Sequence, residues 1–130
     1  MNSIKYLVIE DSYYLACEIQ DYLKKYREDI EIYIAESLND TYRILGQRNI
    51  DLIITNTQVS DGYSIDDFRK NEINIPLIIY STYHITEKKE LTGLKIIDFL
   101  ILPITQKKLE NALKKYELII QNSINNSVCL

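Results

Sequence analysis

Polar side chains that could bind a cation or an oxyanion follow several apolar runs in this sequence. Glu10 and Asp11 follow the first run, Asn56 the third, and Ser81 with Thr82 the fourth. Two adjacent acids at a strand end are unfavourable unless a cation or solvent neutralises their charge. Mg²⁺ prefers carboxylate oxygens. In a functional interpretation, the two acids therefore form half of a Mg²⁺ site.

The same two acids also have a purely structural interpretation. In it, Asp11 caps the helix that follows, and Glu10 is simply solvated. Spacing along the chain favours neither interpretation, so both stay open at this point. The fifth apolar run ends at Leu102 and Pro103, which add no charge to this group of residues.

Five short apolar runs have the character of β-strands. They are IKYLVI (4–9), IEIYIA (30–35), DLIIT (51–55), PLIIY (76–80) and IDFLI (97–101). Four of them are nearly continuous in Ile, Leu and Val, as is typical of parallel strands covered on both faces. The run at 30–35 alternates more, which predicts a strand nearer the sheet edge.

Helical patterns alternate with these strands. They cover residues 12–26, 37–47, 64–71, 85–93 and 105–121, with Ser12 and Thr105 as predicted N-caps. The last helix is expected to bury Leu109, Ala112, Leu113 and Tyr116. The alternation predicts an α/β fold with a five-stranded, doubly wound parallel sheet. Ligands of such sheets bind beyond the carboxyl ends of the strands, where the polar residues above are found.

Length and composition limit the class of protein. With 130 residues, 46% of them hydrophobic and 26% charged, the chain suits one globular domain. A net charge of −4 and a pI near 5.0 argue against nucleic acid as a direct partner. No signal peptide or membrane span is recognised, and Cys17 and Cys129 are expected to be free thiols, so we predict a soluble cytoplasmic protein. Residues 1–121 are predicted to form the domain, and the polar residues 122–130 a tail or the start of a linker.

Four segments together resemble the bacterial response-regulator receiver domain. They are YLVIEDS, DLIITNTQVSDG, IPLIIYSTY and IDFLILPI, and the resemblance covers about residues 3–120. It implies a flavodoxin-like receiver fold. In that family an acidic pair and an aspartate after the third strand hold Mg²⁺, and the aspartate takes a phosphoryl group from a histidine kinase.

The resemblance assigns a family position to each candidate site residue. The assignments are Glu10 and Asp11 to the acidic pair, Asn56 to the phospho-acceptor, Ser81 to the hydroxyl, Thr82 to the small residue after it, Phe99 to the switch aromatic, Leu102 to the lysine and Pro103 to the proline. In the family the bond before that proline is often cis, so a cis Leu102–Pro103 bond is expected.

Two departures decide what the resemblance implies for function. Asn56 cannot form an acyl phosphate, because its amide offers no anionic oxygen to attack phosphorus. Leu102 removes the cation that would pair with phosphoryl oxygens. The Mg²⁺ site of Glu10 and Asp11 with Asn56 is therefore expected to be weak or vestigial, and no cofactor is required. An engineered Asp-to-Asn substitution would explain Asn56 alone, whereas the additional loss of lysine favours a naturally degenerate site.

We therefore predict a non-enzymatic, atypical receiver domain that acts as a regulatory or dimerisation module. The alternatives are an ordinary phospho-accepting receiver captured as an Asp-to-Asn variant, and a stand-alone interaction adaptor. The candidate partners are a histidine kinase, another receiver, an attached output domain or a second copy of the chain, without direct nucleic-acid or membrane binding. The segment IDFLILPITQKKLENAL (97–113) also resembles the corresponding part of receivers attached to LytTR-type DNA-binding domains.

Three further expectations concern residues around the last two strands. His84 is expected in an exposed loop. Tyr80, Tyr83 and Phe99 have two interpretations: an aromatic surface near the last two strands, or Phe99 packed in the core with the two tyrosines partly exposed. Lysines and glutamates of residues 87–90 and 107–117 would give one face a mixed charge. Such a face suits either a salt-sensitive dimer contact or plain solvation.

Overall fold

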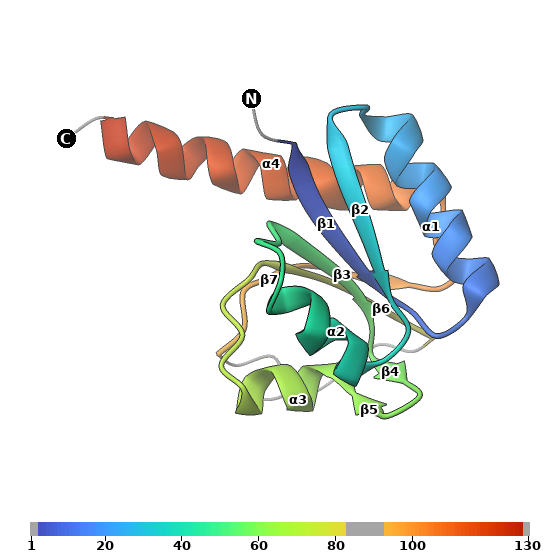
Figure 1. The fold of residues 1–130 in the computed structure, drawn as a ribbon. Coiled ribbons are helices and arrows are strands. Elements are labelled where there is room, and N and C mark those ends of the chain that lie inside the picture. The colour runs from blue at the N-terminus through green and yellow to red at the C-terminus, as the bar shows by residue number, and fades with distance from the viewer. Residues whose placement is uncertain (1–2, 83–92, 129–130) are drawn as a thin grey trace.

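The computed structural model describes residues 3–82 and 93–128, and strands alternate with helices along most of this length (Figure 1). The elements are β1 (Ile4–Ile9), α1 (Tyr13–Tyr26), β2 (Ile30–Ala35), α2 (Leu38–Leu45), β3 (Leu52–Asn56), β4 (Gln58–Val59), β5 (Gly62–Tyr63), α3 (Ser64–Lys70), β6 (Leu77–Ser81), β7 (Ile96–Ile101) and α4 (Gln106–Val128). All five predicted strands form, two of them with the predicted bounds.

The main sheet has five parallel strands in the order β2-β1-β3-β6-β7, which confirms the predicted fold. Strand β2 lies at an edge, as its alternating pattern predicts. Ile9 pairs in register with Thr55, and Asn56 with Tyr80. The carboxyl ends of β1, β3 and β6 therefore meet, and the polar residues that follow them are brought together.

Helices cover both faces of this sheet. On one face, Ile19 and Leu23 of α1 and Leu109 and Leu113 of α4 pack with buried strand residues such as Val8. The other face packs against α2 and α3, through side chains that include Leu38, Ile44, Ile65 and Phe68. Because both faces are covered, the central strands are apolar along nearly their whole length.

The predicted caps of the two long helices are both present. The Ser12 hydroxyl accepts a hydrogen bond from the backbone N–H of Leu15, at 3.3 Å. The Thr105 hydroxyl accepts one from the N–H of Lys108, at 3.2 Å. Each bond satisfies a donor that has no partner inside the helix, so each fixes where its helix begins.

A short hairpin of β4 and β5, which sequence patterns did not predict, follows β3. Its Asp61 carboxylate accepts hydrogen bonds from the backbone N–H groups of Leu38 and Asn39, at 2.7 and 3.0 Å, and so ties the hairpin to the start of α2. Gly62 has φ of +150°, and a Cβ there would lie 3.1 Å from a methyl group of Leu38. Only glycine fits this close approach without a shift.

The end of α4 differs from the prediction. The helix was expected to end near Gln121, with an irregular tail from residue 122, but it continues to Val128 and runs past the edge of the domain (Figure 1). The domain boundary at residue 121 stays a prediction. Residues 83–92 are outside the described part of the chain. They include Tyr83, His84 and all but the last residue of the helix predicted at 85–93. Between residues 3 and 82 and from 93 to 128, no helix has the length and apolar character needed to span a membrane.

Candidate functional site

A polar pocket of about 380 Å³ lies at the carboxyl ends of the central strands. Five of the predicted site positions line it, together with residues 57–60 of the loop after β3: Asp11, Asn56, Ser81, Thr82 and Leu102. The topology thus gathers residues that are far apart in the sequence, as the strand ends predicted. Its chemistry depends on how their charges and hydrogen bonds are arranged.

Glu10 is the buried charge beside this pocket, only 2% exposed. Its Oε1 accepts hydrogen bonds from the Tyr80 hydroxyl at 2.7 Å and from Asn56 Nδ2 at 3.0 Å. Its Oε2 accepts a bond from the backbone N–H of Ser12 at 2.9 Å. The structural interpretation of the acidic pair is therefore wrong in both parts, because Glu10 is not solvated and Ser12, not Asp11, caps α1.

The Asn56 amide completes the environment of Glu10. A carboxylate only accepts hydrogen bonds, so the NH₂ group of Asn56 turns toward it. The amide oxygen faces the other way and accepts a bond from the backbone N–H of Gln58, at 3.4 Å. An aspartate here would instead place a second carboxylate against Glu10, which a cation would have to neutralise. Asn56 thus makes the arrangement stable without added charge.

Tyr80 is the residue of this network that sequence reasoning missed. It was expected to be partly exposed, but it is fully buried on the α1 and α4 face of the sheet. Burial and the nearby Glu10 carboxylate raise the pKa of its hydroxyl well above the usual value, so it stays protonated and donates. The only signal in the sequence was a polar atom at the end of the otherwise apolar run PLIIY.

Leu102 occupies the position where the resemblance implied lysine. It is half-buried, packs against the core cluster of the α1 and α4 face, and donates its backbone N–H to the carbonyl of Ser81 at 2.8 Å. The Leu102–Pro103 bond is cis, as expected. Ser81 is buried and Thr82 is exposed, both at the pocket wall. No cation from this position reaches the pocket.

The side chains present fit a divalent cation poorly. Asp11 is exposed at the pocket, but Glu10 already accepts three hydrogen bonds, and Asn56 presents its NH₂ group to Glu10 instead of its oxygen. Within residues 3–82 and 93–128, no three His, Cys, Asp or Glu side chains are grouped as a metal site requires. The expectation of weak or vestigial Mg²⁺ binding stays a prediction.

Two other predicted features lie away from the pocket. Phe99 is half-buried against the core cluster of the α2 and α3 face, and its role as a switch residue stays a prediction. In the predicted mixed-charge face, Lys115 pairs with Asp98 at 2.9 Å, and Lys108 Nζ donates to the carbonyls of Ile101 and Pro103. These contacts lie within the domain, and they give the lysines a structural role.

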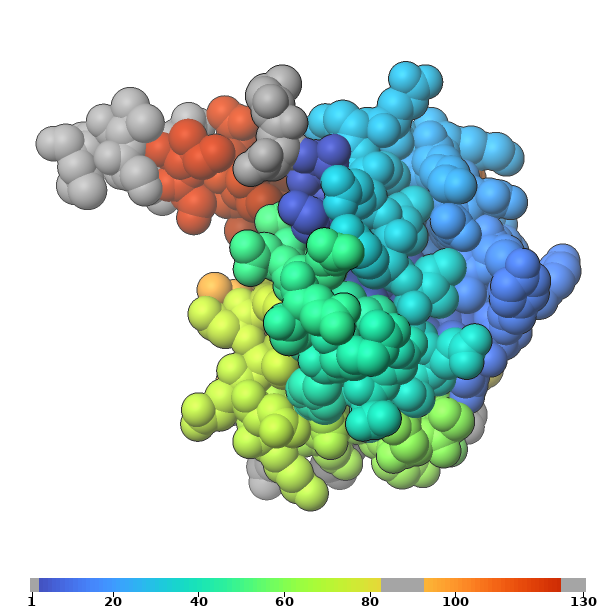
Figure 2. Space-filling model, viewed as in Figure 1, coloured from blue at the N-terminus to red at the C-terminus, as the bar shows by residue number. Residues whose placement is uncertain are grey.

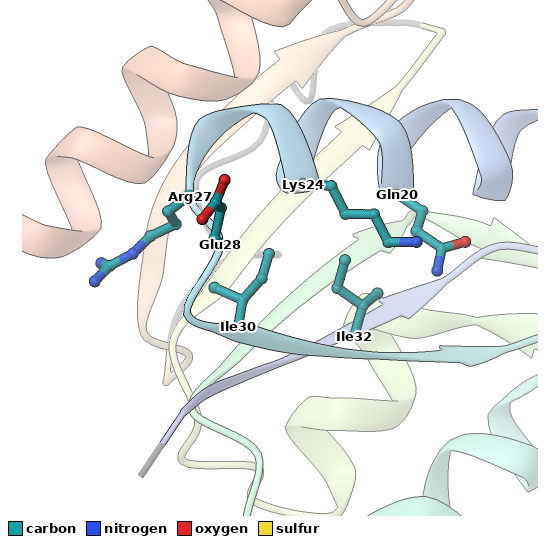
Figure 3. Close-up of a pocket in the computed structure, with 6 residues that line it drawn as sticks. All are labelled: Gln20, Lys24, Arg27, Glu28, Ile30 and Ile32. Atoms are coloured by element: carbon teal, nitrogen blue, oxygen red, sulfur yellow. The ribbon is translucent and has the colours of Figure 1, made fainter. Parts of the chain in front are cut away.

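A second hollow, of about 410 Å³, lies between α1 and β2 (Figure 3). Ile30 and Ile32 form its floor, and Lys24 and Gln20 stand over it, while the Arg27 side chain points away. It is somewhat larger than the polar pocket but lacks convergent polar groups aimed into it. The polar pocket is therefore the better candidate site.

Comparisons with known proteins agree with this architecture. The sensory transduction protein LytT of Bacillus cereus is 25% identical over 123 residues, which cover 93% of this chain and 50% of that protein. The chain thus spans about half the length of the curated relatives it matches. No family model matches the sequence.

Solved structures show the same fold. The response regulatory domain of MrkE from Klebsiella pneumoniae superposes with a TM-score of 0.78 at 14% identity, covering 92% of this chain and 99% of that one. The signal receiver domain of an HD domain-containing protein from Pseudomonas fluorescens gives 0.76 at 16% identity, covering 94% and 99%. The strand order and these similarities show that the chain has the fold of response-regulator receiver domains.

Proposed function

We propose that this receiver domain regulates a protein partner by contact, without taking a phosphoryl group on residue 56. The observation that carries the proposal is the buried Glu10 carboxylate, whose oxygens accept hydrogen bonds from three internal donors. A receiver that works by phosphotransfer needs its carboxylates available to a cation, and it needs an anionic oxygen to attack phosphorus. Here the Glu10 carboxylate is occupied by hydrogen bonds within the protein. Residue 56 is an amide and has no anionic oxygen.

Two departures from the family pattern support natural degeneracy over a laboratory substitution. Asn56 stands at the position of the acceptor, and Leu102 at the position of the lysine. A single engineered change at position 56 would leave Leu102 unexplained. The two departures are also mutually consistent, because less negative charge in the pocket needs less positive charge to balance it.

We propose that this domain acts in the cytoplasm and that its partner is a protein. The acidic balance of the chain disfavours direct nucleic-acid binding. Because the curated relatives are about twice as long as this chain, an attached output domain is one form of the partner, beside a kinase or another receiver. In each case the domain acts through its surface, and it is not an enzyme.

Intact-mass measurement after incubation with acetyl phosphate and Mg²⁺ tests the proposal. The variants are Asn56→Asp with Leu102→Lys, which restores both family residues, and Asn49→Asp, which adds a carboxylate at an exposed position. The wild type and Asn49→Asp are expected to keep their mass, and the double variant to gain one phosphoryl group. A phosphoryl group on the wild type would overturn the proposal. If no variant gains mass, the pocket is closed to phosphotransfer altogether, in agreement with a contact-only module.

A further inference from the structure

The segments that follow β1, β2 and β3 carry a strong excess of negative charge. Residues 10–18, 36–42 and 56–67 contain eight of the chain's 19 Asp and Glu residues and none of its 15 Lys and Arg residues. The rest of the chain holds the other 11 acids and all 15 bases, so its formal charge is positive. Because the carboxyl ends of parallel strands lie at one edge of a sheet, these segments meet at one end of the domain, which we call the acidic end (Figure 1).

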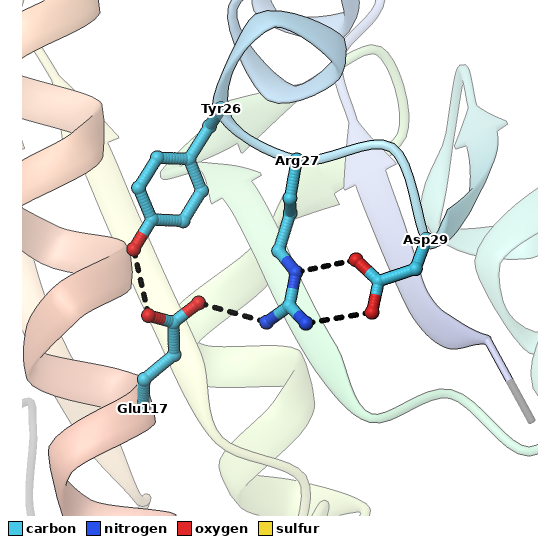
Figure 4. Close-up of polar contacts among 4 residues, drawn as sticks. All are labelled: Tyr26, Arg27, Asp29 and Glu117. Carbon is cyan, nitrogen blue, oxygen red and sulfur yellow. Dashed lines mark hydrogen bonds and ion pairs between the residues drawn. The ribbon is translucent and has the colours of Figure 1, made fainter. Parts of the chain in front are cut away.

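Acidic side chains at the opposite end of the sheet are neutralised within the domain. There, Asp29 and Glu117 share the guanidinium group of Arg27, at 2.7 and 3.0 Å (Figure 4). At the acidic end, the exposed side chains of Asp11 and Glu36 take part in none of the ion pairs found among the described residues. Their charge is therefore available to a partner.

A hollow of about 260 Å³ opens at the acidic end, between α1, the end of β2 and the start of α2. The residues that line it include Glu10, Tyr13, Ala16, Ile34, Glu36 and Asp40. Asp40 pairs with Arg43. The buried Glu10 carboxylate, in contrast, accepts its three hydrogen bonds from neutral groups, so no ion pair among the described residues cancels its charge.

The size and lining of this hollow suit the side chain of a lysine or an arginine. Sites for small molecules usually enclose about 300–1,000 Å³, so the hollow is better matched to a single long side chain. Apolar residues such as Ala16 and Ile34 can cover the methylene groups of that side chain. The carboxylates of Glu10 and Glu36 attract its charged end.

Exposed tyrosines add a second attraction for a cation. Tyr13 and Tyr14 begin α1 and are 83% and 80% exposed, and Tyr63 of the hairpin is exposed too. In the described part of the chain, the other exposed large hydrophobic residues all lie on α4. The hairpin adjoins α2 on the surface (Figure 2), to which Asp61 ties it. Aromatic faces attract Lys and Arg side chains, and tyrosine is enriched among the residues that carry binding energy.

We propose that the acidic end binds a segment of a partner protein that is rich in lysine and arginine, with one cationic side chain in the hollow against the ring of Tyr13. Charge complementarity determines the choice of partner, because uncompensated negative charge attracts a cationic segment and repels an acidic one. The inference rests on the proposed function only in taking the partner to be a protein. Tyr13 and Glu36 lie outside the lining of the polar pocket, so the contact does not require phosphotransfer.

Fluorescence anisotropy of a labelled peptide of alternating arginine and alanine tests the proposal. Titration with the full chain to about 1 mM is expected to show binding, whereas a peptide of alternating glutamate and alanine should not bind. Glu36→Gln removes one exposed charge contact and should weaken binding by about two- to fivefold. Tyr13→Ala removes the cation–π contact and should weaken binding by a similar factor. Both side chains are exposed, so the fold should be unchanged by circular dichroism.

Glu28→Gln and Tyr13→Phe are the matched controls. Glu28 is exposed at the opposite end of the sheet, so its replacement removes the same charge away from the proposed surface. Tyr13→Phe keeps the ring that attracts the cation. Both variants are therefore expected to bind the peptide like the wild type.

Three outcomes would overturn the proposal. The wild type would fail to bind the arginine peptide, or Glu28→Gln would weaken binding as much as Glu36→Gln, which would mean that net charge alone attracts the peptide. Displacement of the peptide by spermidine at equal concentration would favour a free polyamine over a protein segment. A phosphoryl group on the wild type in the mass measurement would overturn the proposed function but leave this binding intact, so the two failures are distinguishable.

Discussion

Two tyrosine–glutamate pairs lie at opposite ends of the sheet and have nearly the same geometry. Tyr80 donates to Glu10 at 2.7 Å beside the pocket, and Tyr26 donates to Glu117 at 2.6 Å where α1 meets α4. The first pair is sealed from water, whereas the Glu117 side chain is 32% exposed. The distances would suggest equal bonds, but the cost of losing a partner depends on whether water can replace it.

The same substitution in the two pairs should give the largest contrast. Glu10→Gln replaces one buried acceptor oxygen with an NH₂ group among donors whose remaining acceptors are few, such as the Ile9 carbonyl at 3.3 Å from the Tyr80 hydroxyl. We expect the free energy of unfolding to fall by about 2–4 kcal/mol. Glu117→Gln is expected to cost less than about 1 kcal/mol, because water reaches that site. Urea denaturation measures both. Equal losses would show that burial does not separate the two networks.

Removing a single hydroxyl should sharpen the contrast. Tyr80→Phe deletes one hydrogen bond to a buried carboxylate and is expected to cost about 1.5–3 kcal/mol. Tyr26→Phe keeps the ion pair of Glu117 with Arg27 and should cost less than about 1 kcal/mol. Added salt should reduce the small effect at Tyr26 further and leave that at Tyr80 nearly unchanged. A salt-sensitive loss at Tyr80 would argue that its site is open to solvent.

Alkaline pH should act on the more open pair first. Burial, and then the hydrogen bond to Glu117, raise the pKa of Tyr26 to about 12, from about 10 in an unfolded chain. The stability from keeping this hydroxyl protonated is fully present below about pH 10 and is lost as the pH rises through about 12. Denaturation at stepped alkaline pH should therefore show a shallower loss in Tyr26→Phe than in the wild type. Identical losses of stability with pH in the two proteins would contradict the attribution of this loss to Tyr26. Ultraviolet titration follows the ionisation of the tyrosines directly.

The smallest effect is expected at Asp61. Hydrogen bonds from the backbone N–H groups of Leu38 and Asn39 lower the pKa of its carboxyl group. The stability it adds is therefore fully present above the ordinary value of about 3.9 and is lost as the pH falls through the lower folded value. Asp61→Asn should make acid unfolding slightly less steep without changing stability much near neutral pH. A large loss at neutral pH would mean that the hairpin holds more of the fold than these two bonds.

The strands and helices were largely predictable because their signals are local. The runs at 4–9 and 30–35 match β1 and β2, and Ser12 and Thr105 cap the helices as expected. The hairpin of β4 and β5 was not predicted, because strands of two residues have no periodicity. The continuation of α4 did have a signal, in Ile120, Ile124 and Val128 at intervals of four, which the polar residues between them obscured.

The site was predictable in its members but not in its bonding. Strand ends placed Asp11, Asn56, Ser81 and Leu102 together, as found. The bond between Tyr80 and Glu10 joins residues 70 positions apart, and no local pattern reports a contact of that kind. The direction of the Asn56 amide was equally hidden, since it depends on the buried carboxylate across the sheet.

The shared oxygen of Glu10 has a consequence for how substitutions around it combine. Tyr80 and Asn56 both donate to Oε1, so the changes in stability caused by substitutions at these two positions should not be additive. Asn56→Asp made alone would set two carboxylates against each other while Leu102 offers no counter-charge. Residues at this end of the sheet therefore constrain one another's identity, and a change at one of them should be tolerated best when another changes with it.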